Sequence, residues 1–162
     1  MSADEKNVLE TYGESVLDLT KIPHGRTGVV LDVSAPEDAG YVSIVVVLEY
    51  RTAATQEQVG HIAKARLAEL DRQNREDIEA GSSLNGLRIV SWEGTTVERI
   101  NGYWAMVKRY VYTLPGEAPR RMENCEFFLG NRIVSILLQN GERTLVPPRP
   151  IFERVKSSVT FN

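Results

Sequence analysis

Residues 103–112 read Tyr103-Trp104-Ala105-Met106-Val107-Lys108-Arg109-Tyr110-Val111-Tyr112 and are rich in aromatic and β-branched side chains. Such residues favour a β-strand, in which successive side chains point to opposite faces of the sheet. One face would carry Tyr103, Ala105, Val107, Arg109 and Val111, and the other Trp104, Met106, Lys108, Tyr110 and Tyr112. The pattern predicts a long strand, continuing to Leu114, whose two faces have different neighbours.

Turn signals on both sides of this strand divide the C-terminal half into further strands. Asn101-Gly102 precedes it, and both residue types tolerate positive φ. Gly130-Asn131 predicts a two-residue hairpin turn. Period-two segments are expected at residues 87–92, 95–100, 103–114, 122–129 and 132–138, with Glu93-Gly94 separating the first two. The sequence therefore predicts an up-and-down arrangement, in which consecutive strands are antiparallel neighbours in the sheet.

The N-terminal half predicts strands at residues 14–19, 28–33 and 41–50, and the β-branched run in the last suits a central strand buried on both faces. Thr55 and Gln58 form a capping box at the start of one long helix. Its apolar stripe, Val59, Ile62, Ala63, Leu67 and Leu70, is expected to pack on the Tyr103–Val111 face of the long strand.

The prolines at positions 147, 148 and 150 predict an extended segment, because each disfavours helix at the residue before it. A short helix from Ile151 to about Ser158 would follow, with Ile151, Phe152 and Val155 on its inner side. The expected fold class is therefore α+β, an antiparallel β-sheet with flanking helices in a single domain.

Composition narrows the function classes. The chain has 162 residues, 42% of them hydrophobic and 25% charged, which is typical of one globular domain. A net charge of −3 argues against nucleic acid or an anionic membrane as the partner. One cysteine excludes an internal disulfide. Without a signal-peptide pattern or a long apolar run, we expect a cytoplasmic protein with no membrane span; the alternative is an exported protein expressed without its leader.

Three segments resemble a known superfamily. They are Ile100-Asn101-Gly102-Tyr103-Trp104-Ala105, Leu129-Gly130-Asn131-Arg132-Ile133-Val134, and the closing segment 151–161 with its Phe152-x-x-Val155-x-x-Ser158 pattern. Their order resembles the Mog1/PsbP-like superfamily, which includes DcrB-type bacterial proteins. The resemblance covers residues 55–162, and the first 50 residues fit only as strands.

The resemblance implies an α/β/α sandwich formed by one Mog1/PsbP-like domain over residues 1–162. Members are binding or accessory proteins, among them a partner of a nuclear small GTPase, an extrinsic photosystem subunit, bacterial lipoproteins and cytosolic chaperones for secreted effectors. The matching positions here are fold positions, so no functional residue is carried over, and a shared fold is weak support for a shared function.

Catalysis has no support in the sequence. His24 and His61 belong to no zinc-binding pattern, and no phosphate-binding loop or nucleophile elbow is present. Cys125 alternates with Phe127 and Leu129 and is expected to be a buried, inert thiol; a hydrolase would need His24 or His61 to approach it. We therefore expect a non-enzyme with no cofactor and no metal.

The leading prediction is a protein- or peptide-binding accessory module. Its contact face would hold Trp104, Met106, Tyr110 and Tyr112, because large amphipathic side chains are enriched at protein contacts. The alternative for Trp104 and Met106 is a second core layer beneath the terminal helix. Arg120 and Arg121 form a second candidate site, for an anionic partner, or simply a solvated loop. An alternative function is a small-molecule or lipid carrier with an apolar cavity between sheet and helices; a homodimer is compatible with either.

Overall fold

The computed structural model describes residues 28–34, 42–82, 86–141 and 148–161. The elements in chain order are β1 (Gly28–Ser34), β2 (Val42–Glu49), α2 (Gln56–Gly60), α3 (Lys64–Ser82), β3 (Arg88–Ile100), β4 (Tyr103–Thr113), β5 (Arg120–Phe128), β6 (Ile133–Gly141) and α4 (Pro148–Ser157). The strand predicted at residues 14–19, and His24, lie outside the described residues.

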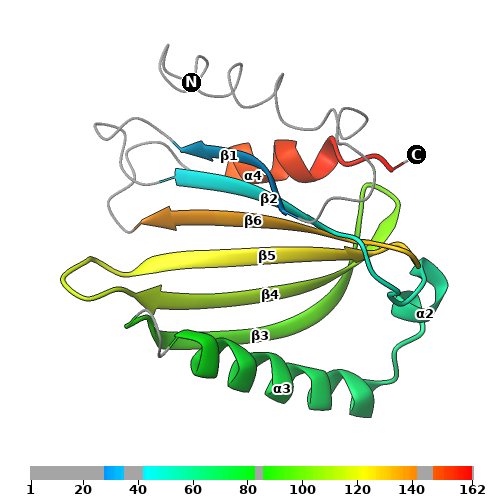
Figure 1. Ribbon diagram of the computed structural model, residues 1–162, viewed down its shortest axis with the longest axis horizontal. Helices are drawn as coiled ribbons and strands as arrows, with labels where there is room; N and C mark the ends of the chain where they lie inside the picture. The colour runs from blue at the N-terminus through cyan, green and yellow to red at the C-terminus, as the bar shows by residue number, and fades with distance from the viewer. Residues whose placement is uncertain (1–27, 35–41, 83–85, 142–147, 162) are drawn as a thin grey trace.

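The strands form one antiparallel sheet in the order β1-β2-β6-β5-β4-β3. Strands β3 to β6 are neighbours in sequence and in space, so the predicted up-and-down order over residues 87–138 is confirmed. β2 lies beside β6, which places it inside the sheet (Figure 1). Its even positions from Val42 to Leu48 are buried, whereas Val45 and Val47 are only half-buried. The α+β class with an antiparallel sheet is therefore confirmed.

Both predicted hairpin turns are present. Asn101 and Gly102 have φ values of 47° and 89°, a conformation that asparagine and glycine adopt with little strain. The side-chain amide of Asn101 also donates to the carbonyl of Val159, 2.6 Å away, and so ties the end of the chain to this turn. At the other hairpin, the N–H of Leu129 donates to the carbonyl of Arg132 at 3.0 Å, and Gly130 has a φ of 80°.

Glu93-Gly94 does not separate two strands, as the sequence suggested. β3 is one strand with irregular register between Ile89 and Ser91 and between Trp92 and Gly94. Gly94, with a φ of 114°, provides the backbone conformation for the second irregularity. The carboxylate of Asp71 accepts the N–H of Thr95 at 2.6 Å and the indole N–H of Trp92 at 3.0 Å. A bulge anchored by α3 therefore lies where a break between two strands was predicted.

The predicted single helix is two helices. Its capping box is confirmed: the hydroxyl of Thr55 accepts the N–H of Gln58, and the Gln58 side chain accepts the N–H of Thr55. However, α2 ends at Gly60, and α3 begins at Lys64. Gly60 lies against the indole of Trp104, and glycine is a poor helix former. The break lets α2 sit at the end of the strands while α3 runs beside β3 (Figure 1).

Replacing Gly60 by alanine is expected to lower the free energy of unfolding by about 1–3 kcal/mol, because a new Cβ would overpack the indole. That Cβ would lie 2.5 Å from Nε1 of Trp104. Gly81→Ala in α3 is the matched control: nothing lies within 4 Å of its Cβ position. There the better helix propensity of alanine should leave stability unchanged or raise it by up to about 1 kcal/mol. Urea unfolding of both variants measures the difference, and equal effects would contradict the close approach.

Helices α3 and α4 each cover the face of the sheet that the sequence had not led us to expect. Ile151, Phe152 and Val155 of α4 pack in the main core with Ala105 and Val107. The rest of this core comes from Val42, Ile44, Val46, Leu48, Ile100, Cys125, Phe127, Val134, Ile136, Leu138 and Val159. The Tyr103–Val111 face of the long strand is therefore covered by the terminal helix and not by the main one.

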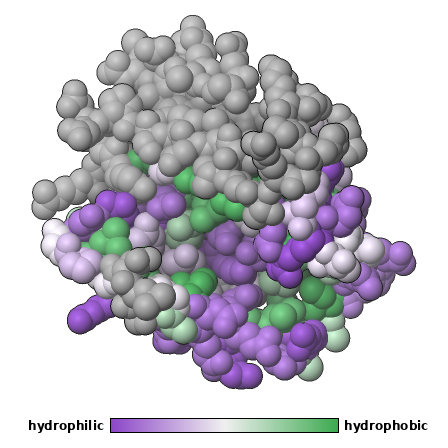
Figure 2. Space-filling view, in the orientation of Figure 1, coloured by the Kyte–Doolittle hydropathy of each residue, from purple (hydrophilic) through white to green (hydrophobic). Residues whose placement is uncertain are grey.

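The main helix α3 packs on the other face through polar as well as apolar side chains. Asn74 donates to the hydroxyl of Thr95 at 3.3 Å and contacts the sulfur of Met106, and Ile78 packs beside Tyr110. Hydrophilic residues gather on the surface where α3 lies (Figure 2). The stripe read from the sequence is only partly buried, since Leu67 and Leu70 are half-buried and Ala63 is exposed. The sequence placed this helix on the wrong face of the sheet. Its inward side is partly polar, because Asp71 and Asn74 hold it to Thr95 of β3.

The proline-rich segment begins α4. Residues Pro148 to Pro150 are helical, so the predicted extended segment is wrong at these positions. Proline is tolerated in the first turn of a helix because the N–H it lacks would have no intrahelical acceptor there. The predicted inner side of this helix is confirmed, since Ile151, Phe152 and Val155 are buried. None of the helices that the structure describes has the length and apolar character needed to cross a membrane.

Candidate functional site: a charged cleft beneath the terminal helix

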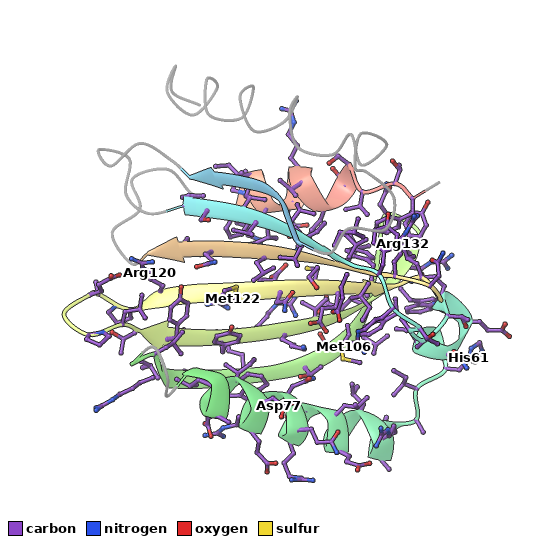
Figure 3. All side chains as sticks on the ribbon, viewed as in Figure 1. His61, Asp77, Met106, Arg120, Met122 and Arg132 are labelled. Atoms are coloured by element: carbon purple, nitrogen blue, oxygen red, sulfur yellow. The ribbon has the colours of Figure 1, made fainter. Side chains whose placement is uncertain are left out.

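The predicted aromatic contact face is mostly interior. Met106, Tyr110 and Tyr112 are 6%, 8% and 5% exposed, and Trp104 is half-buried. Tyr110 stacks on Trp92 with ring centroids 5.5 Å apart, and burial raises the pKa of Tyr110 to about 12. Tyr110 and Tyr112 form a second core layer with Met122, and Ile78 of α3, not the terminal helix, packs against it. Figure 3 shows Met106 between the sheet and α3.

Trp104 has a structural environment of its own. The Gln56 side chain accepts the N–H of Trp104 at 2.6 Å and donates to the carbonyls of Trp104 and Phe128 at 2.9 and 3.1 Å. The guanidinium of Arg99 lies 5.6 Å from the centre of its ring. The indole is thus held between α2 and Arg99. The hydrogen bonds of the Gln56 side chain connect α2 to β4 and β5.

The two predicted arginines point to opposite faces of the sheet because they are successive residues of β5. Arg120 forms an ion pair with Glu117 in the preceding loop, at the end of β5 (Figure 3). Arg121 pairs with Glu93 at 2.6 Å and keeps 52% of its side chain exposed. Only Arg121 lies on the side of the sheet that α4 covers, and there it joins other charged residues.

A cleft of about 490 Å3 lies on that side, between α4 and strands β4, β5 and β6. Within the described part of the chain, its charged lining consists of Arg109, Arg121, Glu123, Arg149, Glu153 and Lys156. Leu138, Asn140 and Phe152 complete the described lining. Among the described residues, two strands and the helix therefore bring together four cationic and two acidic side chains from three separate parts of the sequence.

Glu123 is the centre of the ion-pair network in this cleft. One carboxylate oxygen accepts from Nε of Arg109 at 2.9 Å, and the other accepts from Nζ of Lys156 at 2.8 Å. Arg109 also makes two hydrogen bonds to Glu98, at 2.6 and 3.0 Å. Lys156 makes a second ion pair, with Glu153, at 2.8 Å. Since only 17% of the Glu123 side chain is exposed, the network ties β3, β4 and β5 to α4 in a largely desolvated setting.

The ion pairs of this network shift the pKa values of the residues that form it. Burial alone would raise the pKa of Glu123, but the hydrogen bonds from Lys156 and Arg109 outweigh it and hold that pKa below its usual range. The hydrogen bond from Arg109 is the main reason that the pKa of Glu98 is also lowered. The pKa of Lys156 is raised: burial opposes this, and the bonds to Glu123 and Glu153 prevail. All these groups are therefore charged near neutral pH.

Acid is expected to destabilise the protein through this network. A carboxylate with a lowered folded-state pKa contributes stability above its unfolded pKa of about 4.3, and this stability is lost as pH falls through the folded pKa. The urea midpoint should thus fall below about pH 4.3, and Glu123→Gln should flatten that dependence. A midpoint with the same acid dependence in both proteins would show that Glu123 does not carry it.

Cys125 is fully buried, and its thiol lies 3.8 Å from the carboxylate of Glu123. Burial, together with the negative charge of Glu123, raises the pKa of Cys125 well above its usual value. A nucleophile needs the opposite shift. The ring of His61, at the end of α2, bonds to the carbonyl of Glu57 in that helix, 2.7 Å away. Within the described ranges, no group of acidic, histidine and cysteine residues is arranged to hold a metal ion.

The sequence contained a signal for this cleft. Arg109 interrupts the apolar positions of one β4 face, and Glu123 directly precedes the apolar Cys125 and Phe127 on the same face of β5. The two residues are register partners in the sheet. An opposite-charge pair at matched positions on two apolar strand faces indicates a built ion pair. Arg149 carried no such signal, because it lies in a segment that was read as extended.

Comparisons with known proteins give a fold and no function. No family model matches the chain, and no curated protein matches it. The chain is similar to the crystal structure of PA94, a protein of unknown function from Pseudomonas aeruginosa, with a TM-score of 0.53 and 14% identity. The match covers 87% of this chain and 89% of that one. At this identity the similarity shows a common fold alone.

Proposed function

We propose that this protein is a non-enzymatic accessory module that binds a segment of a partner protein in the cleft between α4 and the sheet. The observation that carries the proposal is the convergence of Arg109, Arg121, Arg149 and Lys156 on one open concavity. Arginine is enriched at protein contacts and forms paired hydrogen bonds with carboxylates. This proposed site differs from the one expected from the sequence. The tyrosines of the aromatic face are buried under α3, whereas the cleft lies on the opposite face of the sheet, under α4.

Two other functions have less support. A carrier of an apolar ligand needs an apolar cavity, whereas the described lining of this cleft has six charged side chains and Asn140. A hydrolase using Cys125 needs an accessible thiolate, whereas this thiol is buried next to a carboxylate that disfavours ionisation. A binding role needs only the exposed charges that the cleft has.

We also propose that the chain is a single Mog1/PsbP-like domain. The resemblance rests on the Asn101-Gly102 turn, the Gly130-Asn131 hairpin and the closing Phe152–Ser158 segment. An antiparallel sheet with α3 and α4 on opposite faces is the architecture that this superfamily implies. The superfamily contains binding proteins of several kinds, so the assignment supports a class of function and names no partner.

The binding proposal is tested by affinity capture from the native host. The tagged protein and its Arg121→Gln/Arg149→Gln variant would be compared by quantitative mass spectrometry of what each retains. Both residues are exposed, so the variant should fold. We expect one or a few proteins to be retained by the parent and by the control Arg154→Gln, and to be lost from the double variant. Equal retention by all three would place the binding surface elsewhere.

A further inference from the structure

The cleft has charges of two kinds. Arg109 and Glu123 are half-buried and are paired with each other and with further residues. Arg121 and Arg149 are exposed. Within the described ranges, Arg121 has one carboxylate partner, Glu93, and Arg149 has none. The inner charges thus hold the architecture together, and the outer cations are available to a ligand.

Arg149 stands at an electrostatically unfavourable place. It lies in the first turn of α4, where the partial positive charge of the helix end disfavours a cation. No acidic side chain lies in that turn to offset it. An anion bound beside Arg149 would relieve this repulsion and form charge-assisted hydrogen bonds. Together with Arg121 and Lys156 across the cleft, the arrangement has the charge of a site for carboxylates.

Glu153 already occupies part of this site. Its carboxylate contacts Nζ of Lys156 at 2.8 Å, yet 60% of the Glu153 side chain is exposed. Because its carboxylate is exposed to water, Glu153 contributes little stability through this pair, about 0–1 kcal/mol. Lys156 itself is held in place by Glu123, with only 12% of its side chain exposed. An incoming carboxylate can therefore replace Glu153 at a cation whose position is already fixed.

We propose, building on the function proposed above, that the cleft recognises an acidic segment of the partner, with Arg149, Arg121 and Lys156 binding its carboxylates and Glu153 acting as a built-in competitor for Lys156. A peptide fits better than a small anion, because the cationic groups come from β5 and from both ends of α4 around about 490 Å3 of space. Phe152 lines the same cleft and is 8% exposed, so it adds a small apolar surface for the chain atoms of such a segment.

The test is calorimetric titration of the full chain with a short capped peptide of alternating glutamate and serine, at low salt. Its lysine–serine counterpart and inorganic phosphate are the comparison ligands. We expect the glutamate peptide to bind and the lysine peptide not to bind. Arg149→Gln should weaken binding about tenfold, the effect of losing one charge-assisted hydrogen bond. Arg154→Gln, at an exposed position of α4 outside the described cleft lining, should leave it unchanged.

Glu153→Gln provides the sharper result. Removing the competitor should tighten binding of the glutamate peptide about threefold or more, since even a weak surface ion pair is then no longer broken on binding. A general surface-charge effect would also strengthen binding in a Glu76→Gln variant, in which an exposed α3 carboxylate paired with Arg72 is removed. We expect no change there. Unchanged or weaker binding by Glu153→Gln would overturn the competitor role.

Other outcomes are equally decisive. Absence of glutamate-peptide binding, or equal binding by the parent and Arg149→Gln, would overturn the inference. Phosphate binding with the same dependence on Arg149, without peptide binding, would identify a small-anion site and also overturn it. If host-partner capture still depends on Arg121 and Arg149 in that case, the proposed function stands and only the acidic character of the segment fails. If capture is independent of both arginines, the proposed function itself fails.

Discussion

Replacing Glu123 by alanine is expected to lower the free energy of unfolding by about 3 kcal/mol, because removing one member of a desolvated ion-pair network leaves its partners uncompensated. Among the described residues, Arg109 would keep Glu98 as its one carboxylate partner, and Lys156 would keep the exposed Glu153. The loss is measured by urea unfolding at neutral pH. Glu123→Gln, which retains one acceptor oxygen, should cost less.

Glu76→Ala is the matched control for this prediction. Glu76 also pairs with an arginine, at 2.7 Å, but 59% of its side chain is exposed. Its removal should change stability by less than about 0.5 kcal/mol. Similar losses of stability for Glu76→Ala and Glu123→Ala would mean that burial does not make the Glu123 ion pairs more stabilising than an exposed pair. A loss below about 1 kcal/mol for Glu123→Ala would contradict its position as the centre of the network.

Replacing Phe127 by alanine is expected to cost about 4 kcal/mol, the usual cost of deleting a buried phenylalanine ring and leaving a cavity. Phe127 is fully buried beneath α4, with its ring centre 5.1 Å from that of Phe161. Phe161 in turn packs on Tyr103. The substitution should therefore also loosen the closing segment near Val159, which hydrogen exchange of its amides would detect.

Phe128→Ala is the comparison that tests the register of β5. Phe128 is the next residue, points to the other face and is only half-buried. Its loss should cost roughly half as much or less, about 1–2 kcal/mol. A larger loss at Phe128 than at Phe127 would mean that β5 is turned over by one residue and that Glu123 and Cys125 do not lie beneath α4.

The sheet could be predicted from sequence because its signals are local. Asn101-Gly102 and Gly130-Asn131 require backbone conformations that few other residue pairs adopt, and period-two patterns lie on both sides of each turn. The capping box at Thr55 was also readable, since its two hydrogen bonds join residues three apart. The end of this helix could not be predicted from the sequence. The helix break after Gly60 depends on Trp104, which is distant in sequence.

The face covered by each helix was not readable either. An apolar stripe says that a helix packs, but the partner is decided by long-range contacts such as Asp71 with the N–H of Thr95. The same limit applies to the site. Met106, Tyr110 and Tyr112 look like a contact face in sequence, and α3 covers them. Arg121 lies in the cleft only because β5 pairs with β4 and α4 packs across both.

The most direct test of the cleft as the binding site is site-specific photo-crosslinking in the native host. A photoreactive amino acid would replace Glu153, a cleft-lining residue whose loss should not weaken binding, in one protein and Arg154 in another, so that two exposed positions of the same helix are compared. The crosslinked products would be identified by mass spectrometry. We predict a discrete partner adduct from position 153, at an acidic segment of that partner, and none from position 154. Adducts of equal yield at both positions, or none at position 153 while the partner is still captured, would contradict binding in the cleft.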